Sequence, residues 1–363
     1  MVSLYRKYRP KTFKEVVGQE HVVKTLTNAL KMGLISHAYL FYGPRGSGKT
    51  TLARLLAKAV NCLSPKINGG FEPCNQCQNC LEINQGKAID LIEIDAASNR
   101  GIDEIRALKE GIEIVPLKAK YKVYIIDEAH QLTKEASNAL LKILEEPPKH
   151  AIFILCTTEF QKMLPTIISR CQKFEFKPLK LKEIVKKLQK IVSEEKIDIE
   201  EKAIELIAKM ARGAMRDAES LFEEVINYKE GKITKGDVEN LLGILDFGKI
   251  SNFVSYLAKK DKEKCFEFLE NLASEGGDLV RFFEMFLEYL HLIFLAKILP
   301  ESLDEKELTH EEKEKIILQS KEFKEAELKE IIEKFTYLES ILRFSQNPLL
   351  PIELTLFEIF EKS

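Results

Sequence analysis

A glycine-rich segment of eight residues constrains this chain more than any other feature. Residues 43–50 read GPRGSGKT and match the pattern G-x-x-x-x-G-K-[ST] in full. The segment follows a short apolar run at 37–42 and precedes a helical pattern at 51–60, so it has the strand–loop–helix context that this motif requires. Glycines let backbone N–H groups curl around an anion, and a helix N-terminus adds positive potential. Motif and context together argue against a chance glycine turn and predict a phosphate-binding loop.

The residue types in this loop suit a nucleoside triphosphate with its magnesium ion. The amine of Lys49 can neutralise charge on the β- and γ-phosphates, and the hydroxyl of Thr50 can bind Mg²⁺. The residues expected to contact the nucleotide here are Gly43, Pro44, Arg45, Gly46, Ser47, Gly48, Lys49, Thr50 and Thr51.

An acidic pair follows a second apolar run. Residues 122–126 read KVYII and are followed at once by Asp127 and Glu128. The carboxyl ends of parallel strands face the crevice where open α/β sheets bind ligands. We expect Asp127 to hold Mg²⁺, through water, and Glu128 to orient and polarise the attacking water. A solvated strand end is the alternative, but the accompanying phosphate loop disfavours it. Two carboxylates favour hydrolysis of ATP over transfer to an acceptor.

Further apolar runs set the fold class. Residues 89–94 and 151–156 are typical of strands, and 172–176 is a weaker candidate. Helical patterns between these runs predict a parallel sheet with crossover helices. After residue 178 the pattern is helical throughout, and an aromatic stripe at 282–289 favours core packing over a cofactor role. The expected fold is α/β followed by all-α, with domains at 1–178, 179–243 and 244–363.

Four cysteines lie in an insertion at 61–86, after the phosphate-loop helix. Their spacing is Cys62-x11-Cys74-x2-Cys77-x2-Cys80, and such tight spacing suits four thiolates around one ion. The insertion holds no histidine, so a structural Zn²⁺ site is the simplest interpretation. An iron–sulfur cluster is the main rival, and four unrelated thiols are the third. The other three cysteines, Cys156, Cys171 and Cys265, are expected to be small buried side chains.

Charge and hydropathy restrict the partners. Among 363 residues, 55 are Lys or Arg and 57 are Asp or Glu, which gives a net charge of −2. A chain without a net positive charge would contact DNA through a local patch. The N-terminus has no apolar signal segment, and the apolar run at 290–299 is too short to span a bilayer. A cytoplasmic protein is expected.

A series of motifs in fixed order resembles a known family. LYRKYRP at 4–10 and VVGQ at 16–19 precede the phosphate loop and the cysteine insertion. DEAH at 127–130, LLKILEEPP at 140–148, SRC at 169–171 and GAMRD at 213–217 follow. Together they resemble the gamma/tau subunit of bacterial DNA polymerase III, a clamp-loader ATPase of the AAA+ class. The resemblance is strong over residues 1–243 and continues by order and length only.

The resemblance implies roles for single residues. Tyr8, Arg9, Pro10 and Val17 would form the adenine pocket. Thr157 or Thr158 would sense the γ-phosphate, and counting back from SRC favours Thr158. Arg170 would be an arginine finger that acts in trans on the ATP of a neighbouring subunit. Arg216 would be a second sensor that contacts phosphate in cis.

The resemblance also implies an assembly. Residues 179–243 would be a helical lid, and 244–363 a collar that joins delta and delta-prime subunits and further copies of this chain in a five-membered ring. The ring would open the sliding clamp (beta) and grip primer-template DNA. Backbone N–H groups at 98–101, which open a helix, could contact a DNA phosphate, with Arg106 about two turns later, although a solvated helix face explains these residues equally well. Polymerase contacts and contacts linked to single-stranded DNA stay open, because the extension of the longer tau form is not part of this sequence. Any label of DNA-directed DNA polymerase or nucleotidyltransferase belongs to the holoenzyme.

Three other classes of protein share some of these sequence features. A replication-factor-C-like subunit or a branch-migration helicase would share the ATPase motifs, but the cysteine insertion argues against both. A nucleotide kinase would need an acceptor pocket and an arginine cluster in its lid. A scaffold with a dead site conflicts with the intact Lys49, Asp127 and Glu128.

Overall fold

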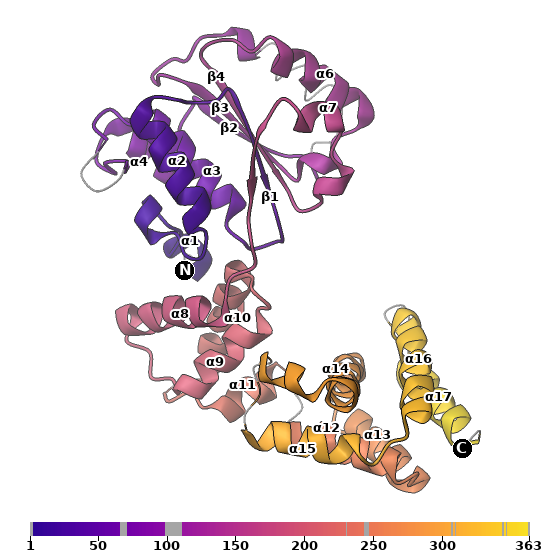
Figure 1. The fold of residues 1–363 in the computed structure, drawn as a ribbon. Helices are drawn as coiled ribbons and strands as arrows, with labels where there is room; N and C mark the ends of the chain where they lie inside the picture. The colour runs from indigo at the N-terminus through magenta and orange to yellow at the C-terminus, as the bar shows by residue number, and fades with distance from the viewer. Residues whose placement is uncertain are drawn as a thin grey trace. The chain divides into compact units, whose positions relative to one another are not determined.

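The computed structural model divides into two compact units, Met1–Lys235 and Gly236–Ser363 (Figure 1). It describes residues 3–65, 71–98, 111–229, 231–242, 247–305, 308, 310–342, 345 and 347–361. No helix within these ranges combines the length and the apolar character needed to cross a membrane.

A five-stranded parallel sheet forms the centre of the first unit. Its strands are β1 (Ala38–Tyr42), β2 (Leu91–Asp95), β3 (Lys122–Asp127), β4 (Ala151–Thr157) and β5 (Gln172–Glu175), in the spatial order β2-β3-β4-β1-β5. The five predicted strands are confirmed, with ends shifted by at most two residues. Every residue of β4 is buried, as expected for a central strand that is covered on both faces.

Helices cover both faces of the sheet (Figure 1). On one face α2 (Glu20–Met32) and α3 (Lys49–Val60) pack against alternate strand residues such as Phe41 and Ile154. On the other face α6 (Lys134–Glu145) and α7 (Pro165–Ile168) pack against the intervening residues, such as Leu40 and Leu155. This alternation follows from the two-residue period of a strand. The short elements of the sheet domain are α1 (Leu4–Lys7), η1 (Phe13–Glu15), α4 (Gln78–Gln85), η2 (Ala129–Gln131) and η3 (Phe160–Lys162).

Three helices follow β5 within the first unit. They are α8 (Leu181–Glu195), α9 (Glu201–Met210) and α10 (Met215–Tyr228), and α11 (Lys235–Leu241) begins at the boundary between the units. Ile184, Leu188 and Ile191 form the buried stripe of α8, which the spacing of apolar residues predicts.

Every described element of the second unit is a helix. It contains α12 (Phe247–Ala258), α13 (Lys262–Ser274), α14 (Leu279–Ile298), η4 (Pro300–Glu305), α15 (His310–Ser320), α16 (Glu325–Leu342) and α17 (Leu349–Glu361). Its core includes an aromatic cluster, in which the ring centre of Phe286 lies 5.1 Å from the ring centres of both Phe253 and Phe335. The aromatic stripe at 282–289 is therefore core packing, as predicted. Cys265 is buried here, and Cys156 and Cys171 are buried in the first unit, also as predicted.

Candidate functional site

The phosphate loop connects β1 to α3, and two of its glycines are required by close packing. Gly43 has a φ of 146°, and a Cβ there would lie 2.1 Å from the carbonyl oxygen of Phe176. Gly46 has a φ of 72°, and a Cβ there would lie 2.6 Å from the Cβ of Ala214. Only glycine tolerates both the backbone angle and the contact. The loop is thus enclosed by the segment after β5 and by the start of α10.

Two side chains at the start of α3 face the loop and the acidic pair. The amine of Lys49 is buried and donates hydrogen bonds to the carbonyl oxygens of Gly43 and Pro44, both at 2.8 Å. Burial lowers its pKa from the ordinary value. The hydroxyl of Thr50 donates to Asp127 Oδ2 at 2.9 Å. The structure therefore brings together the two residues that the sequence predicts as magnesium ligands.

The second carboxylate, Glu128, is held by the end of β4. Its Oε2 accepts hydrogen bonds from Thr158 Oγ1 at 2.8 Å and from Thr158 N at 3.3 Å. Thr157 is fully buried, and its hydroxyl bonds to the ring of His130 at 2.9 Å. Of the two candidate sensor threonines, Thr158 is therefore the one that contacts the predicted catalytic carboxylate.

A pocket in the first unit gathers most of the predicted nucleotide residues. Its walls come from the N-terminal segment, the phosphate loop, the end of β3 and helices α8 and α10. The lining residues are Tyr5, Arg9, Pro10, Glu15, Val16, Val17, Arg45, Gly46, Ser47, Gly48, Lys49, Thr50, Thr51, Asp127, Glu128, Leu179, Lys187, Met215, Arg216 and Glu219. Arg216 also lies over the ring of Tyr5, with its guanidinium carbon 5.1 Å from the ring centre.

Five predicted residues, all in described parts of the chain, lie outside this lining: Tyr8, Gly43, Pro44, Thr158 and Arg170. Tyr8 directs its hydroxyl to Glu195 on α8. Arg170 pairs with Glu145 of α6 at 2.6 Å and donates to the carbonyl oxygen of Thr166 at 2.7 Å.

Several pocket residues have no sequence motif to mark them. Lys187 on α8 and Glu219 on α10 belong to this group. Glu219 interrupts the buried face formed by Ala218, Phe222 and Val225, and a charge on an apolar helix face is a signal that could have found it.

His130 is the last residue of the DEAH segment. Its side chain is only 4% exposed, and its ring lies 3.5 Å from Glu128 and 3.2 Å from Glu159. The ring thus lies next to the predicted catalytic carboxylate. The position of His130 in the DEAH segment, two residues after Glu128, was the signal in the sequence that could have indicated this contact.

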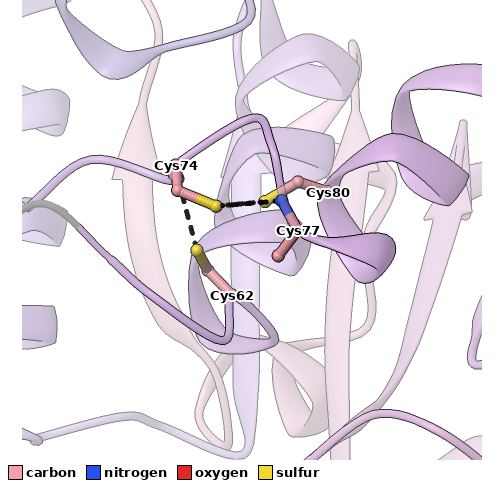
Figure 2. Close-up of side chains that lie close together, drawn as sticks. All are labelled: Cys62, Cys74, Cys77 and Cys80. Carbon is pink, nitrogen blue, oxygen red and sulfur yellow. Dashed lines mark hydrogen bonds between the residues drawn. The ribbon is translucent and has the colours of Figure 1, made fainter.

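The four cysteines of the insertion form one cluster (Figure 2). Cys62 follows α3, Cys74 lies in the connecting loop, Cys77 caps α4, and Cys80 is in its first turn. Their sulfur atoms all lie within 4.8 Å of one another. Four sulfurs around one tetrahedral Zn²⁺ lie about 3.8 Å apart, given a Zn–S distance of about 2.3 Å. The arrangement can hold one such ion.

The surroundings of Cys74 favour a thiolate. Burial raises its pKa, but hydrogen bonds from the backbone N–H groups of Gln76 and Cys77 and from the thiols of Cys62 and Cys77 together lower the pKa to about 6. These N–H groups lie 3.5 Å and 3.3 Å from the Cys74 sulfur. Thiolates are the form that binds metal ions.

Hydrogen bonds join the insertion and the end of α3 to the N-terminal segment. The buried carboxylate of Glu72 accepts hydrogen bonds from Phe13 N at 2.7 Å and Lys14 N at 3.0 Å. The buried amine of Lys58 donates to Lys11 O at 2.7 Å and to Asn75 Oδ1 at 2.7 Å. Residues 11–14 lie between the two parts of the N-terminal segment that line the pocket. The cysteine insertion and the pocket are thereby connected through hydrogen bonds.

The candidate DNA contacts are mostly beyond the described chain. Ser98 is described, and its hydroxyl donates to Asp95 Oδ2 at 2.9 Å. Asn99, Arg100, Gly101 and Arg106 lie outside the described residues.

Three family models match successive parts of the chain between residues 18 and 360. Family models match residues 18–180 ("DNA polymerase III, delta subunit"), 183–231 ("DNA polymerase III clamp loader subunit, ATPase lid domain") and 233–360 ("DNA polymerase III subunits gamma and tau domain III"). The Thermotoga maritima RuvB Holliday junction branch migration motor aligns in structure over 75% of this chain and 86% of that one, with 22% identity and a TM-score of 0.49.

Two curated relatives illustrate the sequence similarity. DNA polymerase III subunit tau of Bacillus subtilis is 46% identical over 82% of this chain and 52% of that protein. DNA polymerase III subunit gamma of Buchnera aphidicola (subspecies Baizongia pistaciae) is 41% identical over 82% of this chain and 80% of that protein. The chain spans about half the length of the tau proteins that it matches, such as those of B. subtilis and Escherichia coli. By these matches, the chain belongs to the gamma/tau subunit family of DNA polymerase III.

Proposed function

We propose that this chain is the ATPase motor subunit of a bacterial clamp loader. In this role it opens the sliding clamp and loads it on primed DNA, within the DNA polymerase III holoenzyme. One observation supports this most: in a member of the gamma/tau family, hydrogen bonds join Thr50 to Asp127 and Thr158 to Glu128 beside a complete phosphate loop. A replication role implies that the chain works in the cytoplasm, with the chromosome.

The proposed reaction starts from the contacts in the pocket. ATP binds between the loop and helix α10, and the amine of Lys49 exchanges its bonds to the loop carbonyls for bonds to phosphate oxygens. When bound, Mg²⁺ would supply positive charge that neutralises the phosphates. Thr50 and Asp127 would hold that ion, because their oxygens already meet at 2.9 Å.

Hydrolysis then depends on Glu128 and Thr158. When the γ-phosphate is in place, the Thr158 hydroxyl can turn from Glu128 to a phosphate oxygen. The freed carboxylate of Glu128 orients water and accepts its proton. Arg216, which lines the pocket, contacts phosphate in the same subunit. Arg170, which is paired with Glu145, completes the site of a neighbouring subunit.

The domain plan and the partners belong to the same proposal. Residues 1–178 bind the nucleotide, 179–243 act as the lid, and 244–363 form the collar. The separate family matches to a lid at 183–231 and to a third domain at 233–360 support this plan. The proposed partners are delta and delta-prime subunits, further copies of this chain, the sliding clamp and primer-template DNA.

We further propose that Cys62, Cys74, Cys77 and Cys80 hold a structural Zn²⁺. The sulfur separations support one ion, because an iron–sulfur cluster of four irons would hold its thiolates farther apart. Purified protein should carry about one zinc ion per chain, with four sulfur ligands by X-ray absorption. An iron–sulfur absorption band, or gently purified protein without metal, would contradict the assignment.

Isolation of the native complex tests the function. Pull-down of the full chain from its own cells, followed by mass spectrometry, should recover delta-type subunits and the sliding clamp in amounts comparable to the chain. The purified complex should load clamps on primed DNA only with ATP. Recovery of the chain without either partner class, or loading that needs no ATP, would contradict the proposal.

A further inference from the structure

A buried carboxylate in the pocket wall has no role in the proposed reaction. Glu219 lies on α10, three residues after Arg216, and lines the same pocket although it is only 5% exposed. Burial raises its pKa to about 7, and the nearby amine of Lys187 offsets this only in part. Within the described chain, no hydrogen bond from a protein group reaches this carboxylate, and its oxygens are not among the enclosed polar atoms that lack a partner, so they open onto the pocket. A hydrogen-bond donor on a ligand in the pocket would therefore stabilise this largely buried acceptor.

The neighbour of Glu219 places it near the N-terminal segment. Lys187 on α8 also lines the pocket, and its amine donates to Tyr8 O at 3.0 Å. Tyr8 immediately precedes Arg9 and Pro10, which line the pocket as well. The two charged residues therefore belong to the part of the pocket where the lid helices meet the N-terminal segment.

The direction of α10 places Glu219 away from the phosphate loop. The helix begins at this loop, because Met215 N donates to Gly46 O at 3.2 Å. Glu219 follows Met215 by four residues, which is about 6 Å along the helix axis. A nucleotide with its phosphates at the loop would direct its sugar and base along this path. Val16, Val17 and Leu179 offer apolar side chains to the same pocket.

We propose that Glu219 is a specificity-determining residue that accepts a hydrogen bond from the nucleoside part of the bound nucleotide. This inference rests on the proposed ATP site. The donors available on adenosine are the 6-amino group of the base and the hydroxyls of the ribose. A site built around a buried hydrogen-bonding group rejects a ligand that lacks the matching donor, because its own group is left unpaired.

Binding of four nucleotides to the full chain tests the inference. ATP is compared with 2′-deoxy-ATP and 3′-deoxy-ATP, which each lack one ribose hydroxyl, and with purine riboside triphosphate, which lacks the amino group. We expect one analogue to bind the wild-type chain about tenfold or more weakly than ATP. That analogue identifies the donor. In Glu219→Leu, ATP should bind as weakly as the discriminated analogue. The ratio of the dissociation constants for the analogue and for ATP should therefore fall to about one.

A matched variant separates recognition from a structural role. Glu224 is exposed on the same helix, and Glu224→Leu should keep the wild-type ratio of the dissociation constants for the analogue and for ATP. If Glu219→Leu does not fold, Glu219→Gln gives the same comparison, with the ratio reduced to a few-fold because the charge is lost.

The outcomes distinguish this inference from the function on which it rests. Tight ATP binding with equal ratios in wild type and Glu219→Leu, or no discrimination by the wild type, would contradict the inference alone. A wild-type chain that binds none of the four nucleotides would contradict the proposed function together with the inference.

Discussion

At the scale of single residues, substitutions of Lys49 and Glu128 should impair different steps: ATP binding in the first case and ATP hydrolysis in the second. Lys49→Ala removes the positive charge of the phosphate loop and should abolish ATP binding. Glu128→Gln keeps an oxygen that can accept from Thr158, so binding should remain. Turnover should fall by about 100-fold or more, because an amide cannot accept the proton of water. Equilibrium ATP binding and steady-state phosphate release measure the two effects. Normal hydrolysis by Glu128→Gln would show that the catalytic assignment is wrong.

The buried carboxyl of Glu219 should make stability depend on pH. Its pKa is raised from 4.5 to about 7 in the folded chain. Its contribution to the free energy of unfolding is most favourable below pH 4.5, where the carboxyl is protonated in both states. This contribution declines between pH 4.5 and about 7 and stays low above pH 7. Glu219→Leu should therefore raise the melting temperature of nucleotide-free protein more at pH 8 than at pH 5. Equal shifts at both pH values, measured by calorimetry with Glu224→Leu as the control, would contradict this.

The sequence predicted one half of the pocket and missed the other. The contact between Thr50 and Asp127 follows from two local motifs, because parallel strands bring their carboxyl ends to one edge. Lys187 and Glu219 lie 32 residues apart on separate helices and belong to no motif. Their place in the pocket depends on how α8 and α10 pack, which no local pattern specifies.

At the scale of elements, the cysteine insertion supports the pocket from outside. Glu72 holds the backbone of residues 13 and 14, although it does not line the pocket. Glu72→Ala would leave two N–H groups without their acceptor, which costs about 1–3 kcal/mol where such groups are buried. ATP affinity should therefore fall several-fold in this variant, while its zinc content stays unchanged.

A matched change within the same insertion provides the control. Glu82 on α4 pairs with Lys118 at 3.0 Å and, within the described chain, makes no hydrogen bond or ion pair with the N-terminal segment. Glu82→Ala should leave ATP affinity at the wild-type value. Equal loss of affinity in both variants would mean that general damage to the insertion, rather than the grip of Glu72, weakens the pocket.

Elements were easier to predict than the contacts between them. The run at 151–156 is apolar throughout and became the central strand β4, because only a strand covered on both faces buries every residue. Helix α6 ends before Pro147, as the proline predicts. The contacts of Glu72 and Lys58 with residues 11–14 join segments about 45–60 residues apart. Such contacts are fixed by tertiary packing, and no periodic pattern in the sequence predicts them.

At the scale of the whole molecule, the position of Arg170 bears on assembly. It lies outside the lining of its own pocket and pairs with Glu145 at the end of α6. If it acts in trans, Arg170→Ala should leave ATP affinity of the isolated chain unchanged and sharply reduce hydrolysis in the complex stimulated by DNA and clamp. Glu145→Ala, which only frees the arginine, should retain that hydrolysis.

Complementation between two inactive chains is the most direct test of the central claim, that this is an ATPase whose sites are completed between subunits. A Lys49→Ala chain keeps Arg170 but lacks a working phosphate loop, and an Arg170→Ala chain has the opposite defect. Each alone should assemble with delta and delta-prime subunits and hydrolyse little ATP. We predict that complexes reconstituted from a mixture of both chains regain clearly measurable hydrolysis, because some intact loops then face an intact arginine. Mixed complexes that assemble fully but stay as inactive as either parent would contradict the account.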